Sequence, residues 1–492
     1  MLLSLVLSKI SDECWKDGFD MSDSALTCDK SSKESILEYA RRLLGKSLKD
    51  LHEHSELPQS GKGGLGTAVE KYHFGYEPNS KSEPDFKEAG VELKCTPLKR
   101  ISDGSMLSKE RLVLNVIDYI EEASKTFATS SFWIKNNLLL LMFYLHEEKK
   151  IPVELVFKIV RLWNFPETDL KIIRDDWTII HNKIIAGKAH ELSEGDTLYL
   201  AACTKGSRAG AEMRQQPNSI IQAPQRAYSI KSKYVNTIIL DSLVHPEMCS
   251  GLFVSDAKKK KILKAQEDAE SVVRSVADYN KDETFEQLIE RKFSAYYGKT
   301  IAEIERILNV SIKPSKKMAY DVCLAILGVK SKKIAEFEKA EIAIKTIRLE
   351  ANGKLKEAMS FPNVNYKEVV KESYWEESAL YRMFTQRFLF VVFRKPVVKD
   401  DKQVRLEKVM FWTMPYKDLV QGEVLWTNTR EKVKADDYDH FIKSSENPVC
   451  HIRPKAQTAD DTTESAQGRQ VKKMCYWLNR EYVLNQITKK EP

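Results

Sequence analysis

Several hallmarks of other protein classes are missing from this chain of 492 residues. None of its 8 cysteines belongs to a Cys-x-x-Cys pair, which argues against a disulfide framework and a structural zinc site. No stretch approaches the roughly 20 consecutive apolar residues needed to cross a bilayer. Glycine (19) and proline (16) are ordinary in number and aromatic residues reach 9%, so neither a collagen-like repeat nor wholesale disorder fits.

The N-terminus lacks the pattern of an export signal. Residues 1–7 are apolar, but no basic residue precedes them and Lys9 and Asp12 follow soon after, so we expect a cytoplasmic protein. Lysine and arginine number 78 against 71 acidic residues, and the resulting charge of +7 permits a nucleic-acid partner without requiring one. At about 150 residues per domain, the length allows two to four domains.

An internal repeat organises the chain, because landmarks of the first half recur in the same order in the second. The matched segments are Gly45-Lys46-Ser47-Leu48 with Gly298-Lys299-Thr300-Ile301, 91–96 with 342–347, 138–144 with 388–393, 199–205 with 449–455, and Tyr228…Tyr234 with Tyr476…Tyr482. The repeat predicts a duplicated α/β domain. Two unrelated α/β domains with similar helix–strand patterns are the alternative.

Hydrophobic periodicity predicts the elements that carry these landmarks. Helices are expected within 31–49 and over 68–74, 155–163 and 170–185, and strands within 84–99 and over 138–145, 198–202 and 227–234. The charge-rich stretch 256–292 is expected to form an extended helical connector. The predicted layout is an extension (1–30), a first domain (31–250), a linker (251–285) and a second domain (286–492).

The most specific motif is Pro84-Asp85, six residues, and then Glu92-Leu93-Lys94. Side chains alternate along a strand, so Glu92 and Lys94 share one face while Leu93 enters the core, and a turn can bring Asp85 beside Glu92. Two carboxylates and an ammonium group suit a Mg²⁺-dependent phosphodiesterase, because Mg²⁺ prefers hard oxygen ligands. The spacing should occur by chance only about 0.1 times in such a chain. A solvated strand face is the alternative.

Two neighbouring features add to this motif. Glu70, on the helix expected at 68–74, could supply a third acid, and Lys62 in the loop Gly61-Lys62-Gly63-Gly64-Leu65-Gly66 could reach DNA. The loop satisfies G-x-G-x-x-G, but it follows a polar segment rather than a buried strand, which argues against dinucleotide binding. No G-K-[ST] closes the glycine run, so a P-loop is excluded as well.

With these residues in place, the sequence resembles the MutH-like endonucleases, which comprise the mismatch-repair nicking enzyme and longer type II restriction enzymes that cut GATC. The resemblance implies a duplicated restriction-endonuclease-like (PD-(D/E)xK) domain, each copy a mixed central sheet flanked by helices. It also implies Asp85, Glu92 and Glu70 as metal ligands for Mg²⁺, with Lys94 and Lys135 as active-site lysines. A solubilising lysine at a strand edge is the alternative for Lys135.

The resemblance further assigns DNA-facing residues in both halves. In the first half these are Lys62, Lys205, Tyr228 and Lys231, although Tyr228 could equally be a core tyrosine. The repair enzyme's Arg-Pro-Lys is replaced here by Cys203-Thr204-Lys205, whereas the second half keeps Arg453-Pro454-Lys455. In the second half the catalytic positions are eroded. Ala343 and Cys323 stand opposite Glu92 and Glu70, and Glu336, opposite Asp85, cannot by itself assemble a two-carboxylate site. Lys345 stands opposite Lys94.

These assignments predict a site-specific, Mg²⁺-dependent double-strand endonuclease that leaves 5′-phosphate ends. The second half, with its incomplete acid set, is expected to bind a second copy of the site and to promote cleavage by the first. Implied partners are double-stranded DNA, a second chain on that DNA, and a companion methyltransferase that does not stay bound; no membrane is involved. A mismatch-repair-type nickase and an inactive DNA-binding regulator are the alternatives.

Overall fold

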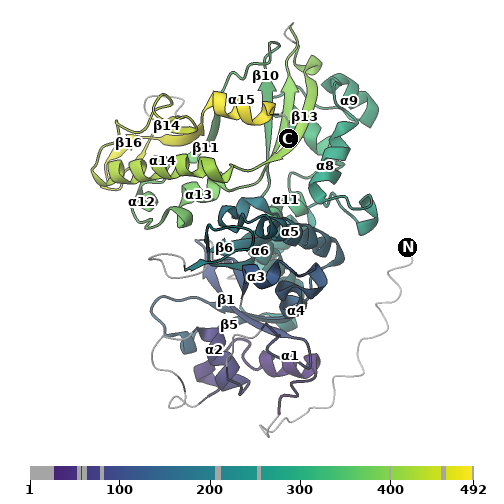
Figure 1. Cartoon of the computed structure of the whole chain (residues 1–492), viewed down its shortest axis with the longest axis vertical. Coiled ribbons are helices and arrows are strands. Elements are labelled where there is room, and N and C mark those ends of the chain that lie inside the picture. Colours follow the sequence, from purple (N-terminus) through teal and green to yellow (C-terminus); the bar gives the residue numbers. More distant parts are fainter. Residues whose placement is uncertain are drawn as a thin grey trace.

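The computed structural model describes residues 27–52, 57, 64–77, 82–102, 104–204, 212–251, 256–397, 400–455 and 461–489. Two lobes are stacked along the long axis in Figure 1, with α1 to α6 in the lower lobe and α8 to α15 in the upper lobe. We call these lobes the first and second half. Lys62 and Lys205, both expected to contact DNA, lie outside the described residues.

A mixed sheet in the order β2-β1-β4-β5 forms the base of the first half. Its strands are β1 (Glu92–Arg100), β2 (Met106–Ser108), β4 (Leu139–Leu145) and β5 (Phe157–Trp163). β1 and β4 run parallel, whereas β2 and β5 are antiparallel to their neighbours. The apolar run of β4 is buried on both faces, as expected of a central strand.

Three expectations about single elements need correction. The segment 155–163 is not helical but largely strand β5, and the strand expected at 227–234 ends at Ile230, after which helix α6 (Ser232–Asp241) begins. The connector is helical only in part, because α7 (Asp256–Glu267) ends well before α8 (Phe285–Ser294). A short apolar run such as 155–163 fits both the helical and the strand periodicity, and its pairing with β4 makes most of this segment a strand.

The second sheet of the first half has the order β3-β9-β6 and is antiparallel throughout. Its strands are β3 (Leu112–Val116), β9 (Arg226–Ile230) and β6 (Leu200–Thr204), with β7 (Met213–Arg214) and β8 (Ala223–Pro224) as a separate hairpin. The remaining helices of this half are α1 (Lys33–Arg41), α2 (Leu65–Ala68), η2 (Val69–His73), α3 (Tyr119–Glu122), α4 (Ser131–Asn136) and α5 (Glu167–Ile185). The two sheets lie side by side, with α5 packed in the core.

The second half repeats both sheets. Strands β10 (Ala343–Leu349), β12 (Phe388–Arg394) and β13 (Arg405–Trp412) match β1, β4 and β5 in order and direction. β11 (Met359–Asn363), β17 (Met474–Leu478) and β14 (Cys450–Pro454) match β3, β9 and β6, and β15 (Thr462–Glu464) pairs with β16 (Gln470–Lys472). Helices α9 (Ile301–Leu308), α10 (Met318–Leu327), α11 (Ala335–Ala340), α12 (Tyr366–Val369), α13 (Ala379–Phe384), α14 (Tyr416–Lys434) and α15 (Arg480–Thr488) complete this half. The predicted duplication is confirmed.

Individual contacts are duplicated as well. The Gly45 amide donates to the Phe157 carbonyl at 2.8 Å, and the Gly298 amide donates to the Leu406 carbonyl at 2.7 Å. Both glycines have a left-handed backbone, with φ of 80° and 76°, which favours glycine at this turn. The sequence repeat at these glycines therefore corresponds to the same turn in each half, packed against β5 in the first and against β13 in the second.

A tyrosine–aspartate hydrogen bond is the second duplicated contact. Tyr234 donates to Asp169 Oδ2 and Tyr482 donates to Asp418 Oδ2, both at 2.8 Å. Each aspartate is the third residue of its long helix, α5 or α14, and each tyrosine lies near the start of α6 or α15. The spacing of six between the tyrosines of each half thus reflects one tertiary contact used twice.

The two halves pack into one body. A single apolar cluster runs from α5 and α6 of the first half to α8, α10 and α11 of the second. Across this contact Lys339 of α11 lies 2.8 Å from both carboxylate oxygens of Asp169. Gly195 approaches the other half so closely that a Cβ there would collide with Thr413 Oγ1 and the Thr385 carbonyl.

No helix in the described part of the chain combines the length and apolar character that a membrane span requires.

Candidate active site

The predicted acidic strand face exists at the start of β1. Leu93 is 3% exposed and packs into the apolar layer below α1 and α2, while Glu92 points to the other side and is itself 1% exposed. Glu92 lies opposite Leu139 in the parallel β1–β4 pair. The alternation expected from the sequence is therefore correct, and it leaves a carboxylate buried beside the central strand.

A tight turn brings Asp85 next to Glu92. Phe86 pairs with Val91 across this turn, and Gly90 has a φ of 66° within it. The Asp85 amide donates to Glu92 Oε2 at 3.1 Å, and the Leu93 amide donates to Asp85 Oδ2 at 3.0 Å. These reciprocal hydrogen bonds fix both carboxyl groups at one end of β1.

Two lysines share one oxygen of Glu92. Lys94 Nζ lies 2.7 Å from Glu92 Oε1, and Lys135 Nζ, from the last turn of α4, lies 3.5 Å from that atom. Lys94 also donates to the Leu114 carbonyl of β3 at 3.3 Å, so the site lies where the two sheets meet. Burial raises the pKa of Glu92, and the nearby Lys94 ammonium opposes that shift.

Glu70 is the third acid of the site and lies on η2. Burial, reinforced by the charges of Asp85 and Glu92, raises the pKa of Glu70 to about 7. The charges of Asp85, Glu92 and Lys94 all act on the Glu70 carboxyl. Carboxylate oxygens are the hard donors that Mg²⁺ prefers.

A divalent cation fits this donor set only in an open arrangement. The described residues contain no group of three His, Cys, Asp or Glu side chains close enough to enclose a metal ion. Mg²⁺ commonly takes one or two carboxylates and completes its shell with water and substrate phosphate. Asp85 and Glu92 provide two neighbouring carboxylates, which is the number that such an arrangement needs.

The structure does not support a DNA-facing role for Tyr228 or Lys231, which corrects our expectation. Tyr228 is fully buried in β9 and donates to Glu122 Oε1 at 3.0 Å. Lys231 is 8% exposed and donates to the Thr197 carbonyl, and burial lowers its pKa to about 8. Tyr228 is covered because β9 is the central strand of its sheet, and Lys231 lies between β9 and α6 with its amide bonded to the Tyr199 carbonyl.

The second half keeps its expected basic residues at the surface. Arg453 and Lys455 are exposed at the end of β14, and the Arg453 guanidinium lies 3.9 Å from the centroid of the Trp477 ring. Cation–π stacking of this kind holds an arginine in a defined orientation while its donors stay available.

The acids of the first half have no counterpart in the second. Ala343 lies opposite Phe388 in the β10–β12 pair, as Glu92 lies opposite Leu139, and Cys323 is buried. Glu336 stands seven residues before Ala343, as Asp85 stands before Glu92, but its carboxylate accepts the amides of Val272 and Val273. It therefore anchors the connector between the halves rather than a cation.

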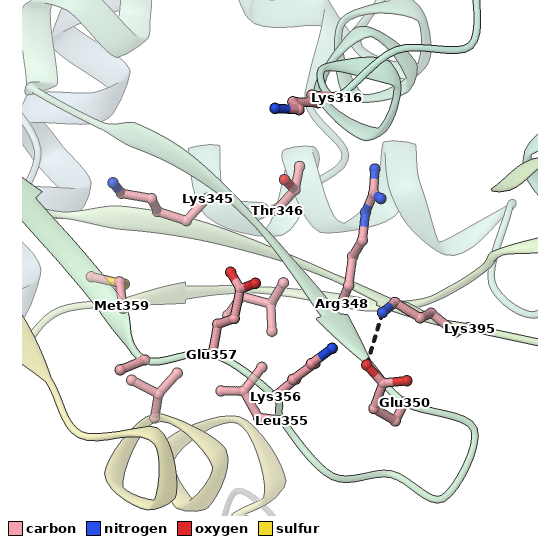
Figure 2. A pocket seen from close by; sticks show the side chains of 13 residues that line it. Lys316, Lys345, Thr346, Arg348, Glu350, Leu355, Lys356, Glu357, Met359 and Lys395 are labelled. Carbon is pink, nitrogen blue, oxygen red and sulfur yellow. Dashed lines mark hydrogen bonds and ion pairs between the residues drawn. The ribbon is translucent and has the colours of Figure 1, made fainter. Parts of the chain in front are cut away.

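A basic cavity lies beside β10 in the second half, and no sequence motif predicted it (Figure 2). It includes Lys316, Arg348, Lys356 and Lys395, which are scattered over 80 positions and form no motif. Of the basic residues in its lining, the sequence indicated only Lys345, because the repeat aligns Lys345 with Lys94.

A restriction-endonuclease-like sheet with Asp85, Glu92 and Lys94 at one strand end defines a DNA-binding hydrolase of the MutH type. The family model described as "DNA mismatch repair enzyme MutH" matches residues 74–176 and 327–421, one segment in each half. The chain is also 34% identical over 485 residues to the type II restriction enzyme Sau3AI of Staphylococcus aureus, which covers 91% of this chain and 93% of that enzyme.

Shorter relatives match only part of the chain. The mismatch repair protein MutH of Vibrio campbellii is 24% identical over 228 residues, which cover 44% of this chain and 98% of the relative. The MutH protein of Serratia proteamaculans is 26% identical over 219 residues, or 42% of this chain and 93% of the relative. The chain belongs to the MutH-like type II restriction endonucleases, which hydrolyse phosphodiester bonds in DNA.

Proposed function

We propose that the chain is a site-specific, Mg²⁺-dependent endonuclease that cuts both strands of DNA at GATC. The observation that carries this proposal is the reciprocal hydrogen bonding of Asp85 and Glu92 beside Lys94. GATC as the target rests on the family resemblance, because base readout depends on side chains in the groove. Asp85 and Glu92 would hold the Mg²⁺ ion, with Glu70 behind them.

The chemistry is hydrolysis of a phosphodiester. A water oxygen bonds to phosphorus while the bond from phosphorus to the 3′ oxygen breaks, which leaves a 5′-phosphate and a 3′-hydroxyl. Bound Mg²⁺ would supply a more acidic water and neutralise charge on the phosphate. Lys94 can orient the attacking water and stabilise developing negative charge, and Lys135 adds a second positive group.

The second half would bind a second copy of the site and promote cleavage by the first. Its exposed Arg453 and Lys455, together with the loss of the acids, support binding without hydrolysis. With one complete acid set per chain, two chains would associate on DNA to cut both strands. A companion methyltransferase would protect the host's own sites, and the enzyme would act in the cytoplasm.

The decisive test is mutation of the acids. Asp85→Ala and Glu92→Ala should abolish Mg²⁺-dependent cleavage of a plasmid with one GATC site while binding of a GATC duplex persists. Glu83→Ala is a matched control, because Glu83 is exposed and forms an ion pair with Lys87. Cleavage at the wild-type rate by either acid variant would disprove the assignment. Sequencing of the ends would report the target and the 5′-phosphate.

A strand nickase is the second candidate, favoured by the single acid set of each chain. It predicts nicked circles as the final product from a one-site plasmid, whereas a restriction enzyme produces linear DNA. An inactive DNA-binding regulator would produce neither product.

A further inference from the structure

We propose that the second half binds a backbone phosphate of duplex DNA directly with lysine and arginine side chains, without a metal ion. The inference rests on the proposed function and specifies how the DNA-binding half works. The place is the cavity between β10 and β11, which we call the basic cavity (Figure 2).

The basic cavity includes Lys345, the counterpart of the active-site residue Lys94. Lys94 bridges β1 to β3 through the Leu114 carbonyl, and the cavity likewise includes Lys345 of β10 and Met359 of β11. Lys345 lies opposite Phe390 as Lys94 lies opposite Leu141, so the two lysines have the same register. A phosphate placed against Lys345 would therefore match the scissile phosphate of the first half.

The cavity has a volume of about 470 Å³ and a surplus of positive charge. β10 contributes Lys345 and Arg348, and the segment leading into β11 contributes Lys356 (Figure 2). Glu350 is engaged by Lys395 at 2.8 Å, which leaves Glu357 as the other carboxylate of the lining. An anion the size of a phosphate is what such a lining would bind.

Lys345 differs from Lys94 in what faces it. Glu92 neutralises Lys94 at 2.7 Å, but Ala343 stands at that place in the second half. Among the residues that the structure describes, none accepts a hydrogen bond or forms an ion pair with the Lys345 ammonium. Burial, reinforced by the Lys455 ammonium, lowers the pKa of Lys345.

An adjoining cavity favours a DNA backbone over a free phosphate ion. It has a volume of about 650 Å³, shares Lys356 and Glu357 with the basic cavity, and continues to Arg453 and Arg480. Cations along two connected cavities suit consecutive phosphates of one strand, whereas a lone ion would need only one of them.

The consequence is a different metal requirement in each half. In the first half the positive charge at the phosphate would come largely from a cation that Asp85 and Glu92 would hold. In the second half it comes from side chains that are permanently present. DNA binding by the second half should therefore persist in EDTA, whereas cleavage by the first half should stop.

The test uses the full chain and a fluorescent GATC duplex, with anisotropy measured in EDTA. Wild-type protein should bind, and Lys345→Ala should weaken binding about tenfold, with a further loss in Lys345→Ala/Arg348→Ala. The salt dependence should fall by about one unit for each phosphate contact removed.

Controls separate the possible failures. Lys371→Ala removes an exposed lysine outside both cavities and should bind like wild type. Lys345→Gln should keep the melting temperature of wild type, so that weaker DNA binding by this variant cannot be attributed to misfolding. Loss of wild-type binding in EDTA, or normal binding by Lys345→Ala, would overturn the inference even if Mg²⁺-dependent cleavage proceeds. Absence of cleavage by wild-type protein would refute the proposed function instead.

One further arm distinguishes DNA from a small anion. Millimolar inorganic phosphate should compete only weakly with the duplex, because it fills one of two cavities. Tight, Lys345-dependent phosphate binding that the duplex does not displace would identify an ion site and overturn the inference.

Discussion

At the scale of single residues, two lysine ammonium groups lie near the same carboxylate oxygen of Glu92. Glu92 Oε1 receives Lys94 at 2.7 Å and Lys135 at 3.5 Å, so two cations offset the burial of this carboxylate. Lys94 is the nearer and is also tied to β3. The two lysines are therefore unequal, and removal of Lys94 should have the larger effect.

Lys94→Ala should lower the rate of cleavage at saturating DNA by about 100-fold or more, since one positioned group stabilising transition-state charge contributes that much. Single-turnover plasmid cleavage in Mg²⁺ measures the rate, and Lys87→Ala, an exposed lysine on the same turn, is the control. A Lys94→Ala rate within threefold of wild type would rule out this role.

How far the site could be predicted depends on the range of the contacts. Asp85, Glu92 and Lys94 lie within ten residues of one another, so strand alternation and one turn were enough to place them together. Tyr228 and Lys231 could not be placed in that way, because their burial depends on which segments cover β9. The basic cavity depends in the same way on residues far apart in the chain.

At the scale of elements, Glu70 depends on a short helical layer with a buried histidine. His73 follows Glu70 on η2, its Nε2 lies 3.0 Å from the Tyr39 carbonyl, and its Nδ1 lies 3.3 Å from His52 Nε2. Burial lowers the pKa of His73 to about 4. The folded layer therefore holds a neutral imidazole, which binds fewer protons than the unfolded chain.

This pKa predicts a loss of stability in mild acid. The contribution is fully present above pH 6.5, the ordinary pKa of histidine, and falls as the pH drops toward 4, by up to about 3 kcal/mol. His73→Gln cannot titrate and should flatten this part of the pH dependence. Urea unfolding of both proteins between pH 7.5 and pH 4.5 measures the difference, and parallel curves would contradict the prediction.

Elements with strong periodicity were predicted well, and short apolar ones were not. The long helix α5 and the central strand β4 emerge from their own patterns. The segment 155–163 is apolar with both periods, and only its pairing with β4 makes it β5. Tertiary pairing, which no local pattern contains, decided that case.

At the scale of the whole molecule, the halves are joined by a buried ion pair within an apolar contact. Lys339 lies over the Tyr234 ring, 5.5 Å from its centroid, while it contacts Asp169. Asp169 is 3% exposed and also accepts from Tyr234. The repeat itself was visible in the sequence, but this contact joins residues 170 positions apart and had no signature.

Lys339→Ala should lower the free energy of unfolding by about 3 kcal/mol, because it leaves a buried carboxylate without its cation. Lys371→Ala removes a lysine from an exposed pair and should cost less than about 1 kcal/mol. Denaturant melts of both variants measure the values. Equal stability of the two would show that the junction between the halves does not depend on this pair.

The carboxylate of Glu336 makes a second acid site at the start of β10 difficult to build by mutation. Bonded to Val272 and Val273, it secures the very segment that ties the lobes together. A glutamate introduced at position 343 would have Glu336 seven residues before it, but that carboxylate is already bonded to the connector. Freeing Glu336 for a metal ion would break the hydrogen bonds that hold the connector between the halves. A second acid site in this half would therefore need several substitutions together rather than one.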